Sequence, residues 1–221
     1  MPRPLATDFQ TAWHAFHGES LPVGHLLGDY TGWNTARFHL LPDHRANAHS
    51  HDELRDLLAR YNLMACETLG EGEPCYMVML QTINQNASQT ARLDRLKRRY
   101  NMEFSMSFYC PEDNYTYAAY ATPSAWFNQR FNRELLNIYQ QRLWDVIWMN
   151  QRTGAVLRPY DAGVDVSQPS PKALMDLVSK HYNWLPTNGS GFLRFNPAQM
   201  KDARFTVTKS CAEAIKRATS A

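Results

Sequence analysis

The chain is poor in glycine and has no closely paired cysteines, and both shortages exclude kinds of chemistry. Ten glycines among 221 residues leave little room for the glycine-rich loops that cradle phosphates, and no such motif is present. The four cysteines form no CxxC pair and lie in apolar or helical surroundings, which indicates free, reduced thiols. A GxSxG motif for a serine nucleophile is also missing. We therefore expect a protein that is not an enzyme and that has no cofactor.

Long apolar runs and an excess of one charge are missing as well. Apolar runs such as Tyr76–Leu80 are far shorter than the roughly 18 residues that span a bilayer. The first ten residues contain no apolar stretch suited to a signal peptide. Lysine and arginine total 23 against 21 acidic residues, a net charge of +2, which is too balanced to indicate a polyanionic partner. The sequence therefore predicts a cytoplasmic protein. We expect it to bind no membrane, and on these grounds nucleic acid is not the partner that we expect.

Aromatic residues are plentiful at 12% of the chain, and they indicate a folded protein with a substantial core. Apolar periodicity and turn residues predict helices and strands in irregular alternation. We expect an α+β fold, with a mainly antiparallel sheet of hairpins and a meander and with flanking helices. The predicted helices are 9–16, 49–68, 92–100, 128–141, 172–182 and 210–218, and the predicted strands are 35–41, 75–82, 103–110, 115–121, 144–150, 155–160 and 163–167.

The distribution of proline, asparagine and glycine suggests the domain organisation. Residues 1–185 are expected to form a single α+β domain, and two sub-lobes, if present, would meet near residues 122–142. The segment 186–221 is rich in these turn residues, and we expect it to be a C-terminal extension with one short helix.

The histidines His49 and His51 form an HxH pair, which chelates metal ions when it lies in a strand. Here the pair comes just before a predicted helix, where this spacing points the two rings about 200° apart. A helix cap supplied by Ser50 or Asp52 is the better interpretation. We expect no metal site.

Two acidic residues, Asp161 and Asp165, flank a glycine after a predicted strand and could converge at a tight turn. Together with Arg37, His39 and Tyr160 they could line a cleft that binds a small ligand or performs acid–base catalysis. The alternative is structural: Asp161 makes an Asx-turn, and Asp165 lies on the polar face of a strand.

One dense basic cluster lies in the predicted helix 92–100, and its side chains run nearly around that helix. With Tyr100 beside it, the cluster could bind RNA, which is a second alternative function. A solvated helix face or a contact with an acidic protein is the simpler interpretation. The cluster comprises Arg92, Arg95, Lys97, Arg98 and Arg99.

Two segments carry a resemblance to a family. The first runs from Trp33 through Arg37-Phe38-His39 to Pro42, and the second contains Tyr160-Asp161, Gly163 and Asp165-Val166, with Tyr182 to Leu185 further on. Together they resemble an uncharacterised bacterial family, a domain of unknown function, with WxRFHxLP and YDxRGxDV-like motifs. The arginine of the second motif is absent here, which favours a structural turn.

The resemblance implies a cytoplasmic α+β protein and, by association, an immunity protein that neutralises a toxin by direct binding. Trp, Tyr and Arg are the residues that most often anchor protein interfaces. The leading hypothesis is therefore a protein-binding protein whose partner is a cognate toxin. The expected contact residues lie in two turns: Glu112, Asp113 and Tyr115 in one, and Tyr160, Asp161 and Asp165 in the other.

Overall fold

The protein is built around one eight-stranded sheet with the order β3-β4-β2-β5-β6-β7-β1-β8. This computed structural model describes residues 8–30, 32–42, 45–83, 87–161, 163–186, 193–200, 206 and 208–219. All neighbouring strands are antiparallel, which confirms the predicted α+β class and sheet type. The strands are β1 (Asn34–His39), β2 (Pro74–Thr82), β3 (Glu103–Cys110), β4 (Tyr115–Ala125), β5 (Val146–Asn150), β6 (Val156–Tyr160), β7 (Gly163–Gln168) and β8 (Leu193–Arg194).

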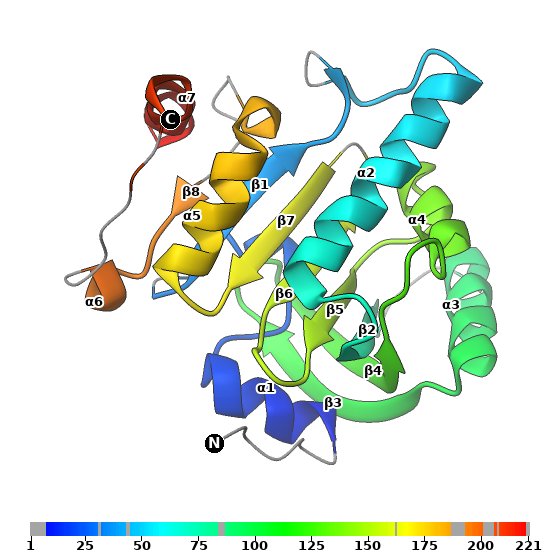
Figure 1. The fold of residues 1–221 in the computed structure, drawn as a ribbon. Helices are drawn as coiled ribbons and strands as arrows, with labels where there is room; N and C mark the ends of the chain where they lie inside the picture. Colours follow the sequence, from blue (N-terminus) through cyan, green and yellow to red (C-terminus); the bar gives the residue numbers. More distant parts are fainter. Residues whose placement is uncertain are drawn as a thin grey trace.

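Helices cover the sheet on both faces. In Figure 1, α2 and α5 lie side by side across one face, over β6, β7 and β1, and contacts between these elements agree. On the opposite face, α1 packs its Phe9 and Trp13 in a core shared with Tyr76 and Val78 of β2. The helices are α1 (Phe9–His17), α2 (His51–Leu69), α3 (Ala87–Tyr100), α4 (Asn132–Tyr139), α5 (Pro171–Lys180), α6 (Pro197–Met200) and α7 (Lys209–Thr219).

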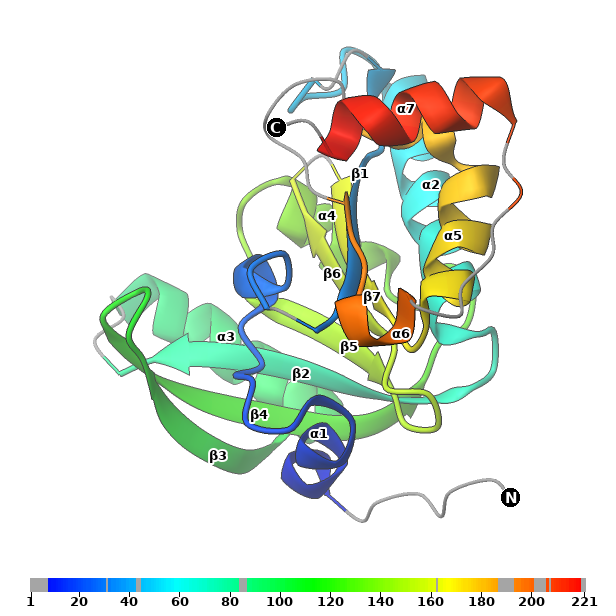
Figure 2. The ribbon, with the colours of Figure 1, turned by 90° about the vertical axis from the view of Figure 1, so that its left-hand side faces the viewer.

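The sheet twists strongly from one end to the other, as antiparallel sheets do. Figure 2 shows the long strands β2, β3 and β4 running across the view, whereas β1 and β7 run up it. Strand β4 continues past the predicted end at residue 121 and includes Pro123, which lies opposite Tyr76 of β2. The pairing of β4 with β3 ends at Ala121, so beyond that point β4 has one neighbour and the missing N–H of proline is tolerated.

Local signals in the sequence set most helix ends. The Asp8 carboxylate accepts a hydrogen bond from the Thr11 amide at 2.8 Å and caps α1, and the Ser50 hydroxyl accepts one from the Glu53 amide at 3.1 Å and caps α2. Residue His49 lies outside α2.

The predicted helix 128–141 is too long at both ends. Gln129 has φ +66° and Gln141 has φ +53°, which is the left-handed region and is incompatible with a right-handed helix. The helix α4 is therefore confined to Asn132–Tyr139.

The segment after residue 185 joins the sheet and the core. In β8, Leu193 lies opposite Ala36 and Arg194 lies opposite Thr35, so β8 is an edge strand beside β1. Leu193 of β8 and Cys211 and Ala214 of α7 are buried in the core on the α2 and α5 face. None of the helices in the described ranges is long and apolar enough to cross a membrane.

Candidate functional site

The carboxylate of Asp165 is the centre of a buried ionic cluster. Strand register places Arg37 of β1 and Arg158 of β6 directly opposite Asp165 of β7, on the face of the sheet that points away from α2. Arg37 Nε donates to Asp165 Oδ1 at 2.7 Å and Arg37 Nη2 donates to Oδ2 at 2.9 Å, while Arg158 Nη1 donates to Oδ2 at 3.0 Å. Asp165 is completely buried. Both of its oxygens are satisfied by charge-assisted hydrogen bonds, as in a structural ion cluster.

The ring of Tyr160 lies against both arginines. The guanidinium carbons of Arg37 and Arg158 are 5.1 Å and 5.4 Å from its centroid, within the range of cation–π attraction. The Tyr160 hydroxyl donates to the Phe38 carbonyl at 3.4 Å. Burial raises the pKa of Tyr160, so the side chain is a neutral phenol. His39 approaches the same ring edge-on, with the ring centroids 6.4 Å apart.

The expected cleft does not collect all five residues. Tyr160 and Asp161 line a cavity of about 170 Å³ together with Trp144, Asp145 and Arg158, whereas Arg37, His39 and Asp165 do not line it. This volume is below the range of about 300–1,000 Å³ that is typical of ligand sites. Asp161 accepts a hydrogen bond from Gln141 Nε2 at 3.0 Å. The two aspartates thus have separate environments.

The turn between β3 and β4 presents side chains of two kinds. Glu112 is exposed, and 52% of Tyr115 is accessible to solvent. Asp113 instead points inward, where Tyr117 Oη donates to its Oδ2 at 2.6 Å and His25 Nε2 lies 2.9 Å from its Oδ1. Partial burial acts to raise the pKa of Asp113, but these hydrogen bonds outweigh it and lower the pKa. Through the same hydrogen bonds Asp113 holds the turn against residues 24–26.

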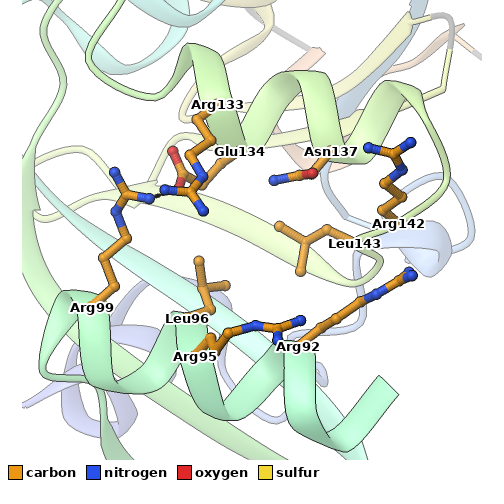
Figure 3. A pocket seen from close by; sticks show the side chains of 9 residues that line it. All are labelled: Arg92, Arg95, Leu96, Arg99, Arg133, Glu134, Asn137, Arg142 and Leu143. Atoms are coloured by element: carbon orange, nitrogen blue, oxygen red, sulfur yellow. Dashed lines mark ion pairs between the residues drawn. The ribbon is translucent and has the colours of Figure 1, made fainter. Parts of the chain in front are cut away.

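A second, larger cavity of about 310 Å³ lies between α3 and α4 and is lined by five arginines (Figure 3). Three come from α3 at positions 92, 95 and 99, a spacing that places them on one helix face. The α4 side provides Arg133, and Arg142 follows that helix. We call this site the arginine pocket; its other lining residues are Leu96, Glu134, Asn137 and Leu143.

Three of the five basic side chains of α3 therefore share one helix face, and the other two do not. Lys97 points elsewhere, forming an ion pair with Asp94 at 2.7 Å and a cation–π contact with Tyr120 at 4.2 Å. Arg98 does not line the arginine pocket. The spacing of residues 92, 95 and 99 was visible in the sequence, whereas Arg133, Asn137 and Arg142 were not associated with it, because only the fold brings α4 opposite α3.

One carboxylate lies within the arginine pocket. Glu134 is 2% exposed, and its Oε1 is 3.9 Å from Arg99 Nη1. Burial, the charge of Glu134 and a hydrogen bond with it raise the pKa of Tyr100, so the tyrosine keeps its proton and donates a hydrogen bond to the carboxylate. Glu134 is therefore fixed from both sides and orients Arg99 at the edge of the pocket (Figure 3).

Metal and thiol chemistry find little support in the part of the chain that the structure describes. No group of three or more His, Cys, Asp or Glu side chains there could hold a metal ion. Burial raises the pKa of Cys66 to about 11 and that of Cys75 to about 12, so these thiols are protonated and unreactive at neutral pH.

The fold and these sites define an α+β protein with a cationic pocket beside a twisted antiparallel sheet. Its sequence matches the family described as Domain of unknown function (DUF3885) over residues 23–188. The chain belongs to this family. No curated protein and no solved structure matches it.

Proposed function

We propose that this protein binds another protein directly and acts as an immunity protein that neutralises a cognate toxin in the bacterial cytoplasm. The observation that supports this proposal is the edge of the sheet at β3, beside which no further strand lies among the residues that the structure describes. There, Phe104 and Tyr109 are more than half exposed, as is Tyr115 in the adjoining strand. An exposed edge strand offers unpaired backbone groups to a partner, and exposed aromatic side chains supply contact area.

The charge of this edge indicates the kind of partner. Residues 101–129 contain no lysine, arginine or histidine, and Glu103 and Glu112 are exposed at opposite ends of β3 and its turn. An acidic and aromatic surface is complementary to a basic partner surface, which increases the association rate and the specificity. A toxin that acts on nucleic acid presents such a basic surface.

The expected contact residues support this proposal unequally. Glu112 and Tyr115 lie on the β3–β4 edge and are exposed. Asp113 is committed to His25 and Tyr117, and Asp165 is fully enclosed. The contact surface that we propose is therefore β3 with its turn, and it excludes Asp165.

The alternative of an enzyme or small-ligand binder built on Arg37, His39, Asp161 and Asp165 has less support. Arg37 donates two hydrogen bonds to Asp165, so the charge of this carboxylate is already balanced within the protein. A base must reach the proton that it abstracts, and Asp165 has no exposed surface.

The test is neutralisation of the toxin encoded beside the gene. The double variant Glu103→Lys/Glu112→Lys reverses the charge of the edge, and we expect it to weaken the complex with that toxin at least about tenfold and to abolish growth protection. Asp56→Lys/Glu213→Lys makes the same charge change at exposed positions elsewhere and should protect as the native chain does. Equal protection by both double variants, or the absence of a stoichiometric complex with the native chain, contradicts the proposal.

A further inference from the structure

The arginine pocket has far more positive than negative charge. Its described lining residues contribute five guanidinium groups and a single carboxylate, Glu134. Among the described residues, Arg99 is the only one of the five arginines with an acidic partner within 4 Å. The chain as a whole has a net charge of only +2, so this excess is local. Like charges held together on facing helices repel one another unless an anion lies between them.

The arginine side chains of the pocket come from two facing segments of the chain rather than from a single helix face. In Figure 3, the side chains of Arg99 and Arg133 approach each other from opposite helices, whereas Arg92 lies at the other end of the pocket and Arg142 lies on the α4 side of that end. The apolar floor consists of Leu96 and Leu143, which are 8% and 5% exposed. Guanidinium groups that face one another over an apolar floor can hold an anion from two sides.

The identity of the cations indicates the anion. All five are arginine, whose planar fork donates two parallel hydrogen bonds to phosphate or carboxylate oxygens. The neighbouring Lys97 is directed away to Asp94 and Tyr120. Four or more unneutralised guanidinium groups match a ligand with several negative charges better than a single carboxylate.

The remaining lining residues and the volume exclude larger classes of ligand. Among the residues that the structure describes, no aromatic side chain lines the pocket, whereas proteins that bind single-stranded RNA stack its bases on aromatic rings. The volume of about 310 Å³ is at the lower end of the range for small-molecule sites. The pocket therefore suits a short phosphate chain.

We infer that the arginine pocket, formed by Arg92, Arg95 and Arg99 of α3 facing Arg133 and Arg142, binds a small molecule through a chain of two or more phosphate groups. Asn137 provides an amide donor within the site, and Glu134 holds Arg99 in place. This inference goes beyond the proposed function and uses a different surface from the β3 edge.

The test is calorimetric titration of the full chain with inorganic tripolyphosphate at low ionic strength, with pyrophosphate, orthophosphate and ATP in parallel. We expect saturable one-to-one binding of tripolyphosphate, weaker binding of pyrophosphate, and little binding of orthophosphate. ATP should bind no more tightly than tripolyphosphate, because the pocket has no group that stacks on a base. Binding of ATP more than tenfold tighter than tripolyphosphate would contradict a site that recognises the phosphate chain alone.

Matched variants locate the site. Arg95→Gln/Arg133→Gln removes one guanidinium from each helix and should weaken tripolyphosphate binding at least about tenfold. Arg95→Lys/Arg133→Lys keeps the charge but loses the forks, and it should give an intermediate loss. The control Arg98→Gln/Arg217→Gln removes the same charge at exposed positions outside the pocket and should leave the affinity within twofold.

Two further results would overturn the inference. One is equal weakening by the pocket variant and the control variant, which would mean that the overall charge attracts the anion. The other is saturable binding of a single-stranded RNA by the native chain with no binding of tripolyphosphate, which would assign the cluster to nucleic acid. Circular dichroism and urea unfolding of each variant confirm that a lost affinity is not a lost fold.

Discussion

At the scale of single residues, Asp165 has the most demanding position in the chain. It is a fully buried carboxylate whose two partners, Arg37 and Arg158, are themselves only 23% and 18% exposed. Removing one member of a buried ionic group leaves the others charged, desolvated and without a counter-ion. The hydrogen bonds and charge of Asp165 outweigh the burial of Arg37 and raise the pKa of that arginine, so Arg37 stays protonated beside the carboxylate.

We therefore expect Asp165→Asn to lower the free energy of unfolding by about 3–5 kcal/mol, measured by urea denaturation. The amide keeps the size of the side chain but removes its charge and one acceptor oxygen. Asp161→Asn, which makes the same change near solvent, should alter stability by no more than about 0.5 kcal/mol. A similar small effect at both positions would show that the cluster contributes little to folding.

Residue-scale patterns in the sequence predicted the chemistry of this cluster only in part. The alternation of the strands indicated that Asp165 lies on a polar strand face, as one of the two interpretations had it. The sequence patterns did not indicate that Arg37 faces Asp165. The two residues are separated by 128 positions, and only the strand register brings them together. The same limit applies to the arginine pocket, whose α3 half could be predicted from helical spacing and whose α4 half could not.

At the scale of elements, α1 is anchored by aromatic stacking at its C-terminal end. The ring of His17 lies between Trp13 and Trp33, with centroid distances of 4.3 Å and 4.2 Å. Burial lowers the pKa of His17 to about 4, against a smaller opposing effect of its hydrogen bond to Gly154. The imidazole is therefore neutral when α1 is docked, and protonation favours release of the helix.

The contribution of His17 should make the protein sensitive to acid. Its folded pKa of about 4 lies below the ordinary value of 6.5, so this contribution is complete above pH 6.5 and is lost as the pH falls from 6.5 to 4, by at most about 3 kcal/mol. His17→Phe should flatten the dependence of unfolding free energy on pH in that interval. An unchanged slope in urea titrations at several pH values would mean that His17 does not couple α1 to pH.

His25 serves as a comparison within the same measurement. Hydrogen bonding to Asp145 and Asp113 raises its pKa, so its contribution is complete below pH 6.5 and declines as the pH rises through its folded pKa. His25→Gln should therefore alter the alkaline side of the stability curve and leave the acidic slope in place.

Most elements were predictable from local sequence, and the misjudged ends have local physical causes. Amphipathic periodicity and the Ser50 cap predicted α2 to within a residue or two at each end. The helix α4 begins later than predicted because of the backbone conformation at Gln129. The strand β4 extends further than predicted because it no longer pairs with β3 at Pro123. Neither condition can be read from residue type, because each depends on which strand or loop lies beside the segment.

At the scale of the whole molecule, the sheet is completed by residues beyond the family match, which ends at residue 188. Strand β8 covers the outer edge of β1, and α7 adds Cys211 and Ala214 to the core. Without them, β1 would be an exposed edge strand with buried-type residues, which favours association with other chains.

A chain that ends after residue 188 should thus unfold at a lower urea concentration, with a loss of about 3 kcal/mol or more from the burial of Leu193 and its neighbours. It should also form concentration-dependent oligomers in light scattering, because the edge of β1 is open. Leu193→Asp in the full chain is the matched point variant and should lower the midpoint in the same direction. An unchanged midpoint in the shortened chain would mean that residues 189–221 do not support the sheet.

The position of β1 in the sheet also has a consequence for synthesis on the ribosome. Both strands that pair with β1 come much later in the chain, and Arg37 and Asp165 are separated by 128 positions. At about 5–20 residues per second, β1 waits roughly 6–26 s for its first partner. During that time β1 has no partner strand, and its Phe38, which is completely buried in the native state, remains exposed. The nascent chain is therefore prone to aggregate during that interval. The sheet topology also means that folding cannot begin with the pairing of β1.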